Sequence, residues 1–257
     1  MNAWSIGYNI NLAGSLMATS LRGGMGVATQ PVAERPHFLF ELYDFEACPY
    51  CRLVREALTE LDLDATIYPC PKGGKRYRPR VAELGGKAQF PFFVDPNRGV
   101  QMYESADIVA YLFETYGKRK PPVYWQWMEL QQLGSGVAGA VRLGAGMRVA
   151  PSVPAAKPLE LYSFESSPFA RPVRERLCEL EIPYVVRSCG RSNFADWMPP
   201  QVRDSVYPDY EPETVNRRAL KARAGRVTIP YLVDPNTATE MGESSEILAY
   251  LDATYGA

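Results

Sequence analysis

The chain contains two copies of one sequence pattern, and this internal repeat constrains the fold more than any other feature. The segment Glu41–Leu61 recurs as Glu160–Leu180, a shift of 119 residues. A later segment, Phe90–Asn97, recurs as Ile229–Asn236 with a shift of 139. The second copy therefore carries 20 extra residues, which we place in the polar stretch 190–226. A repeat of this length predicts two structural units of the same fold.

Each copy has the same predicted order of strands and helices. A short apolar strand at 38–43 leads into a helix whose apolar residues, Leu53 to Leu61, share one face. A second strand follows at 65–68, and a hairpin at 92–103 leads to a closing helix. That helix begins at Ser105, whose hydroxyl can cap its first free amides. The order is βαβ followed by ββα, which predicts an α/β protein with two four-stranded mixed sheets, each flanked by helices.

Composition and charge exclude several classes of protein. The net charge is −1, so no excess of Lys and Arg is available to neutralise the phosphates of a nucleic acid. No apolar run reaches the length of a membrane span, and the N-terminus lacks the pattern of a secretory signal. Five cysteines, two of them in one C-x-x-C pair, are typical of a reducing compartment. We expect an intracellular protein with neither a nucleic-acid partner nor a membrane span.

The C-x-x-C pair, Cys48 to Cys51, lies between the first strand and the first helix. A thiol attacks disulfides as the thiolate, which a helix N-terminus and nearby cations stabilise. Cys48 precedes the helix, and Arg52 and Arg55 follow it, so we expect Cys48 to be the nucleophile. Cys51, one turn into the helix, is then the resolving thiol. The alternative is that both cysteines are small buried residues with a purely structural role.

The remaining cysteines and the single histidine predict no metal site. An all-protein zinc site needs about four ligands, but the chain has no second C-x-x-C pair and only one histidine, His37. Cys70 and Cys189 occupy equivalent positions in the two copies, and Cys178 aligns with Thr59. We expect these three cysteines to pack as small buried side chains.

Three motifs together resemble a known family. Cys48-Pro49-Tyr50-Cys51 at a helix start, Phe90-Pro91 before a hairpin and Glu104-Ser105 at the last helix resemble the glutaredoxins and the N-terminal domain of glutathione S-transferases. The duplication is similar to tandem proteins of plants and algae built from two such domains. The resemblance implies two thioredoxin-like domains and glutathione as co-substrate. It adds a plastid to the cytoplasm as a compartment, and it leaves open an iron–sulfur cluster bridged between two molecules with glutathione as co-ligand. It divides the chain into an arm (1–37), a first domain (38–117), a linker (118–158) and a second domain (159–257).

The resemblance also implies roles for individual residues. Pro91 and Pro230 match the family's cis-proline, which turns the backbone of the preceding residue toward the cysteine of glutathione. Glu104 and Ser105 match the pair that holds the γ-glutamyl end. The implied glutathione contacts of the first domain are Tyr50, Phe90, Pro91, Glu104 and Ser105, and those of a second site are Ser167, Ile229, Pro230, Glu243 and Ser244. The alternatives are a proline that begins a strand and serines that cap helices.

Three functions follow from these expectations. The first is a glutathione-dependent thiol–disulfide oxidoreductase that acts on a small-molecule or protein disulfide, with the second domain as a degenerate partner. The second is a glutathione transferase that uses Cys48 or Ser167, although no all-helical C-terminal domain follows either copy. The third is a glutathione-sensing or scaffold protein without catalysis. A homodimer is compatible with all three.

The regions before the two copies are also related. The segment Arg22–Ala28 is similar to Arg142–Ala150, and both follow runs of small residues. Gly14 and Ala18 in the first run, like Gly136 and Ala140 in the second, have the four-residue spacing that permits close helix contact. One hypothesis is a pair of packed helices between the domains, and the alternative is a pair of flexible glycine-rich linkers.

Overall fold

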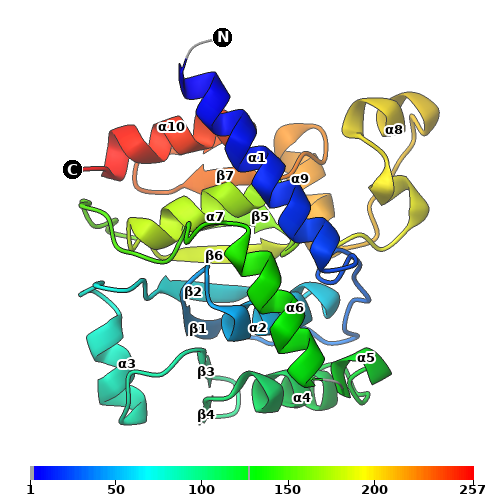
Figure 1. The fold of residues 1–257 in the computed structure, drawn as a ribbon. Coiled ribbons are helices and arrows are strands. Elements are labelled where there is room, and N and C mark those ends of the chain that lie inside the picture. Colours follow the sequence, from blue (N-terminus) through cyan, green and yellow to red (C-terminus); the bar gives the residue numbers. More distant parts are fainter. Residues whose placement is uncertain (1–2, 127) are drawn as a thin grey trace.

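The computed structural model describes residues 3–126 and 128–257, and its elements follow the repeat (Figure 1). The first half contains α1 (Ala3–Leu21), β1 (Phe40–Asp44), α2 (Pro49–Glu60), β2 (Ala65–Pro69), α3 (Arg78–Gly85), β3 (Phe92–Asp95), β4 (Val100–Met102) and α4 (Ser105–Thr115). The second half contains α5 (Val123–Gln126), α6 (Met128–Ala140), β5 (Leu159–Ser163), α7 (Ala170–Glu179), β6 (Tyr184–Ser188), the 3-10 helix η1 (Phe194–Trp197), α8 (Pro200–Val206), α9 (Val215–Ala224), β7 (Tyr231–Asp234), β8 (Thr239–Met241) and α10 (Ser244–Tyr255).

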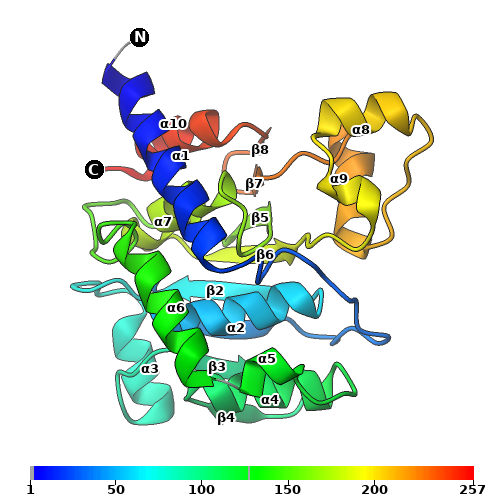
Figure 2. The same cartoon turned by 45° about the vertical axis from the view of Figure 1, so that its right-hand side comes forward.

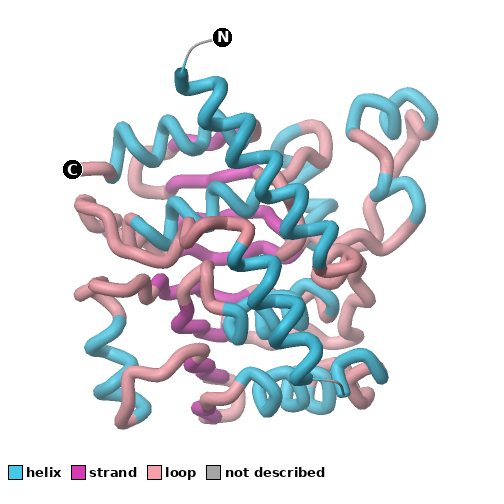
Figure 3. Tube along the Cα trace, viewed as in Figure 1, coloured by secondary structure: helices cyan, strands magenta, loops and turns pink. Residues whose placement is uncertain are grey.

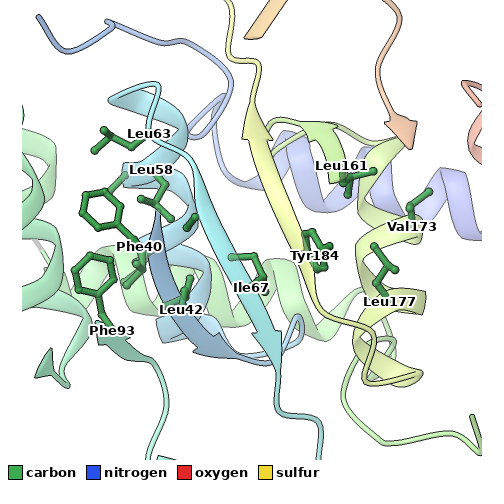
Figure 4. Packing of buried hydrophobic residues seen from close by; sticks show 14 of the residues in the cluster. Phe40, Leu42, Leu58, Leu63, Ile67, Phe93, Leu161, Val173, Leu177 and Tyr184 are labelled. Atoms are coloured by element: carbon green, nitrogen blue, oxygen red, sulfur yellow. The ribbon is translucent and has the colours of Figure 1, made fainter. Parts of the chain in front are cut away.

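The strands form one eight-stranded sheet in the order β4-β3-β1-β2-β6-β5-β7-β8 (Figure 3). In each half a parallel pair, β1–β2 or β5–β6, is extended by an antiparallel hairpin, β3–β4 or β7–β8. This arrangement confirms the predicted mixed α/β fold with two thioredoxin-like units. The sequence did not predict that the two sheets join: β2 pairs antiparallel with β6, so that Ile67 lies opposite Tyr184 (Figure 4).

The main hydrophobic core runs through both halves on one face of the sheet. Helices α2 and α4 cover this face in the first half, and α7 and α10 cover it in the second. Leu42, Leu58 and Phe93 are buried there in the first half, as are Leu161 and Leu177 in the second (Figure 4). The opposite face carries two smaller clusters, one under α3 and one under α9. Because the core is continuous, the two units pack as one body.

The helices α1 and α6 form an outer layer across α2 and α7 (Figures 1 and 2). The regions preceding the two copies therefore contain helices that contact each other, rather than flexible linkers. The absence of a side chain at Gly14 leaves room for the guanidinium of Arg142, because a Cβ atom at position 14 would lie only 2.9 Å from the Nη1 atom of Arg142. The corresponding glycine in α6 is Gly134, which faces Arg22, and not Gly136, whose added Cβ would meet nothing within 4 Å.

The polar residues of α2 and α7 are buried, and the ion pairs that they form across the two units hold the units together. Arg55 in α2 donates to Glu165 of the second unit at 3.0 Å. Arg174 in α7 donates in the reverse direction to Glu46 of the first unit, also at 3.0 Å. Asp44 accepts a further hydrogen bond from Arg55. Buried charges are costly unless they are paired in this way, so the network ties the two units to one relative position.

The extra residues of the second copy form a lobe at one end of the sheet. The helix α9 has the place in the second unit that α3 has in the first, against the smaller cluster of its own unit. The preceding residues fold into η1 and α8, which stand out beside α9 (Figure 2). Within this lobe Asp196 accepts hydrogen bonds from Arg217 at 3.0 Å and from Tyr210. The lobe is therefore an ordered part of the second unit.

Candidate functional site

The two thiols of the C-x-x-C pair lie at the start of α2, immediately after the turn that ends β1. Cys48 is the N-cap residue, and its sulfur accepts a hydrogen bond from the backbone N–H of Cys51 at 3.3 Å. The Cys51 thiol and the backbone amides of Cys51 and Tyr50 lower the pKa of Cys48, although burial opposes them. Burial raises the pKa of Cys51 well above its usual range. Cys48 is thus the more acidic of the two thiols, and the geometry favours it as the nucleophile.

Of the two arginines predicted to stabilise this thiolate, Arg55 is engaged elsewhere and that part of the prediction is wrong. Arg55 donates to Asp44 and Glu165, and the nearest carboxylate to Arg52 is also Glu165, at 3.5 Å. The Arg55 guanidinium therefore belongs to the buried network between the units. Arg52 lines the cavity beside Cys48, and its Nη1 atom has no hydrogen-bond partner, so its contribution to the thiolate stays a prediction. The helix N-terminus and the Cys51 thiol also stabilise Cys48.

Helix α6 covers the Cys48 loop. Only 4% of the Cys48 surface is exposed, and the hydroxyl of Ser135 donates to the carbonyl of Pro49 at 2.8 Å. Between α6 and the loop lies a cavity of about 10 Å³ lined by Cys48, Ser135 and Gly139, which is roughly enough for one water molecule. A tripeptide cannot reach Cys48 through this cavity, so access on this side requires α6 to move.

The other predicted contacts of the first unit surround the same end of the sheet. The peptide bond between Phe90 and Pro91 is cis, and the Phe90 ring packs beneath the guanidinium of Arg78 at 4.6 Å. Glu104 has a positive φ of 64° and accepts a hydrogen bond from the Gln89 side chain at 2.6 Å.

Two further predicted residues differ in exposure. Ser105 begins α4 and is buried, but its hydroxyl does not cap the helix as predicted, because Glu104 occupies the N-cap position without a side-chain hydrogen bond. Tyr50 is 47% exposed beside the thiol loop. The Tyr50 side chain is thus the most accessible group next to Cys48 in the C-x-x-C motif.

The second unit reproduces this arrangement without thiols. The hydroxyl of Ser167 accepts from the N–H of Ala170 at 3.1 Å, which is the helix-capping role given above as the alternative. The peptide bond between Ile229 and Pro230 is cis. The N-terminal arm covers this region, because Thr19 of α1 donates to the carbonyl of Ser166 at 2.9 Å.

The predicted pair Glu243 and Ser244 stands at the start of α10. Glu243 occupies the N-cap position, as Glu104 does in the first unit, and Ser244 is buried. The Ser244 hydroxyl lies 2.6 Å from the hydroxyl of Tyr8 in α1. Each unit is thus covered by the helix that precedes the other unit: α6 lies over the first and α1 over the second.

A cavity of about 410 Å³ opens beside Ser167, between the second unit and its extra lobe. Its wall includes Ser167 and Ile229 together with Arg191 and Trp197. Sequence reasoning missed this cavity because the lobe carries no recognised motif. Its run of tryptophan, methionine and two prolines at 197–200, apolar in an otherwise polar stretch, was the available signal.

The remaining cysteines do not contribute to either site. Cys70 and Cys189 are buried just after β2 and β6, and burial raises the pKa of both thiols. Cys178 is buried in α7 and donates to the carbonyl of Gly146 at 3.3 Å. Across residues 3–126 and 128–257, no cluster of three His, Cys, Asp or Glu side chains has metal-binding geometry. None of the helices in those ranges is long and apolar enough to cross a membrane.

In the comparison with known proteins, one family model matches both halves of the chain. The family model for the glutathione S-transferase N-terminal domain matches residues 42–120 and, separately, residues 161–257. The two matches together span more than half of the chain and contain both the C-x-x-C loop and its counterpart at Ser167. No curated protein and no solved structure gives a significant match.

Proposed function

Because the chain belongs to the glutathione S-transferase N-terminal-domain family, we propose that it is a glutathione-dependent thiol–disulfide oxidoreductase with Cys48 as its nucleophile. Family membership links the chain to glutathione, and the position of Cys48 at the N-cap of α2 carries the choice of reaction. Its sulfur already accepts the Cys51 N–H at 3.3 Å, and its pKa is lowered. A thiol whose pKa is lowered, beside a second thiol whose pKa is raised, suits disulfide exchange.

The reaction proceeds by two sulfur exchanges. The Cys48 thiolate attacks the glutathione sulfur of a mixed disulfide, a Cys48–glutathione disulfide forms, and the substrate leaves as a thiolate that takes up a proton. A second glutathione, as its thiolate, attacks the bound glutathione sulfur, which releases glutathione disulfide and restores the Cys48 thiolate. Cys51 provides a second route: after losing its proton it attacks Cys48, forms an internal disulfide and releases reduced glutathione.

Access to Cys48 is part of this proposal. The Ser135–Pro49 hydrogen bond holds α6 over the thiol loop, and the cavity beneath it does not admit glutathione. On this side, glutathione therefore reaches Cys48 only in a form in which α6 has moved away from the loop. Exchange rates should then depend on the strength of the α6 contact as well as on the thiol pKa.

A glutathione transferase reaction at Ser167 is a second candidate, favoured by one observation. Ser167 borders a cavity of about 410 Å³, whereas Cys48 borders one of about 10 Å³. Ser167 uses its oxygen as an acceptor from Ala170 and is itself 1% exposed, so donating its hydroxyl proton to a bound thiolate requires a shift of the neighbouring side chains. An electrophile in the cavity would be attacked by the glutathione sulfur at this position.

A coupled assay distinguishes these candidates. Purified protein is tested for reduction of the mixed disulfide between glutathione and 2-hydroxyethanethiol by added glutathione. Glutathione reductase and NADPH report the turnover. The oxidoreductase predicts that Cys48→Ser abolishes turnover, while Cys51→Ser and the control Ser167→Ala retain it. Conjugation of an electrophile that survives Cys48→Ser but not Ser167→Ala would instead support the transferase. Glutathione binding with neither activity would support the sensing or scaffold alternative and refute both enzymes.

A further inference from the structure

The cavity beside the extra lobe has the size and lining of a small-molecule site. Its volume of about 410 Å³ lies in the usual range of roughly 300 to 1,000 Å³ for ligand pockets. The lobe supplies one wall through Trp197, Met198 and two prolines, and the body of the unit supplies the other through Phe164 and Phe169. The first unit lacks the 20 residues that form this lobe. The cavity is therefore a property of the second unit alone.

Aromatic surface remains exposed at this cavity. Trp197 is 50% exposed and Phe169 is 45% exposed, although both line the cavity wall. Large aromatic side chains bury far more of their surface when they only fill a core. These two rings offer apolar area that a flat or apolar ligand would cover.

Of the three arginines that line this cavity, two form ion pairs with carboxylates and one does not. Arg217 pairs with Asp196 at 3.0 Å, and Arg203 pairs with Asp204 at 2.8 Å. Arg191 also lines the cavity, and none of the ion pairs among the described residues includes it.

Arg191 is held in place by rings instead of by a carboxylate. Its guanidinium lies 4.7 Å from the ring centroid of Trp197 and 5.4 Å from that of Phe164. Its Nε atom is buried without a hydrogen-bond partner. Burial and the neighbouring charge of Arg217 lower its pKa, while the Asp196 carboxylate, which pairs with Arg217 and also lines the cavity, acts in the opposite direction. Because none of the ion pairs among the described residues gives this guanidinium a carboxylate partner, an anion in the cavity would supply one.

We propose that this cavity binds a small organic anion with an aromatic or other apolar body. The carboxylate or sulfonate group pairs with Arg191, and the body lies against Trp197 and Phe169. The site is independent of the Cys48 chemistry, because no residue of the first unit lines the cavity. A ligand there would lie next to Ser167 and Ile229, the positions that correspond to Cys48 and Phe90.

The test uses two dyes of similar shape and different charge. The full chain is titrated with 8-anilinonaphthalene-1-sulfonate, which is anionic, and with N-phenyl-1-naphthylamine, which is neutral. We expect saturable binding of the anionic dye that weakens at least tenfold in Arg191→Gln. The matched control is Arg218→Gln, an arginine on the exposed side of α9 that does not line the cavity. Cys48→Ser should bind the dye like the wild type.

A second variant covers the case in which Arg191→Gln does not fold. Gln201 lies on the cavity wall and is exposed, so Gln201→Trp should obstruct the cavity without disturbing the core. We expect the same loss of dye binding in this variant. The proposal is overturned if Gln201→Trp binds the anionic dye as tightly as the wild type does. It is also overturned if the neutral dye binds as tightly as the anionic one, or if Arg218→Gln weakens binding as much as Arg191→Gln does.

Discussion

Removing the Ser135 hydroxyl should accelerate the chemical labelling of Cys48. Ser135 is 1% exposed, and its hydrogen bond to the Pro49 carbonyl is a direct polar link between α6 and the thiol loop. A hydrogen bond of this kind contributes about 1 kcal/mol to the closed state. Since 1.4 kcal/mol corresponds to a factor of ten, Ser135→Ala should raise the population with α6 displaced roughly fivefold.

The assay is alkylation of the reduced protein with iodoacetamide, followed by mass spectrometry of the peptide that contains Cys48. When opening is fast relative to alkylation, the labelling rate follows the open population. The repeat supplies a matched control: Ser15 is the equivalent residue in α1, equally buried, but its hydroxyl has no hydrogen-bond partner. Ser15→Ala should leave the Cys48 rate unchanged. An unchanged rate in Ser135→Ala, or an equal increase in both variants, would refute the role of α6 as a cover.

Three further predictions concern the buried charges and thiols. Glu46→Gln should lower the free energy of unfolding by about 3 to 5 kcal/mol in urea denaturation, because it leaves buried cations unpaired, whereas Glu240→Gln at the surface should cost less than about 1 kcal/mol. Burial raises the pKa of Asp44 from 3.8 to about 6, so the native state holds this proton more tightly and wild-type stability falls as the pH rises through this window. The free energy of unfolding of Asp44→Asn should therefore rise by up to about 3 kcal/mol relative to that of the wild type between pH 4 and pH 7, at roughly 1.36 kcal/mol per pKa unit. Equal pH profiles of the two proteins would contradict this. Cys70 and Cys189 should stay unlabelled by iodoacetamide in the native protein over the time in which Cys48 reacts, and equal labelling of all three would contradict their burial.

The fold of each unit could be predicted because its signals are local. The alternating apolar residues of β1 and the apolar face of α2 occur twice, and both copies fold as the pattern indicates. The join between β2 and β6 could not be predicted in this way. It depends on which strand edge stays unpaired within a unit, and the apolar run 65–68 has the same composition in an edge strand as in a central one.

The polar face of α2 shows why the site was only partly predictable. The sequence places Arg55 two turns after Cys48 in the same helix, which predicts a charge near the thiolate. In the structure the second unit covers the polar face of α2, and the Arg55 guanidinium donates hydrogen bonds to Glu165 and Asp44. The position of Cys48 depends only on the local strand–turn–helix sequence and was predictable. Its cover and the cavity in the lobe depend on segments far apart in the chain, which pattern alone does not bring together.

The pairing of β2 with β6 has a symmetry that bears on how such a chain arises and changes. Ala65 pairs with Val186 and Ile67 with Tyr184, and a shift of 119 residues converts each pair into the other. The edge is therefore self-complementary, like the interface of a two-fold symmetric dimer. The tandem chain is in effect a homodimer joined into one polypeptide. In a two-chain dimer every substitution appears twice, but here one half can keep its thiols while the other loses them and acquires a lobe.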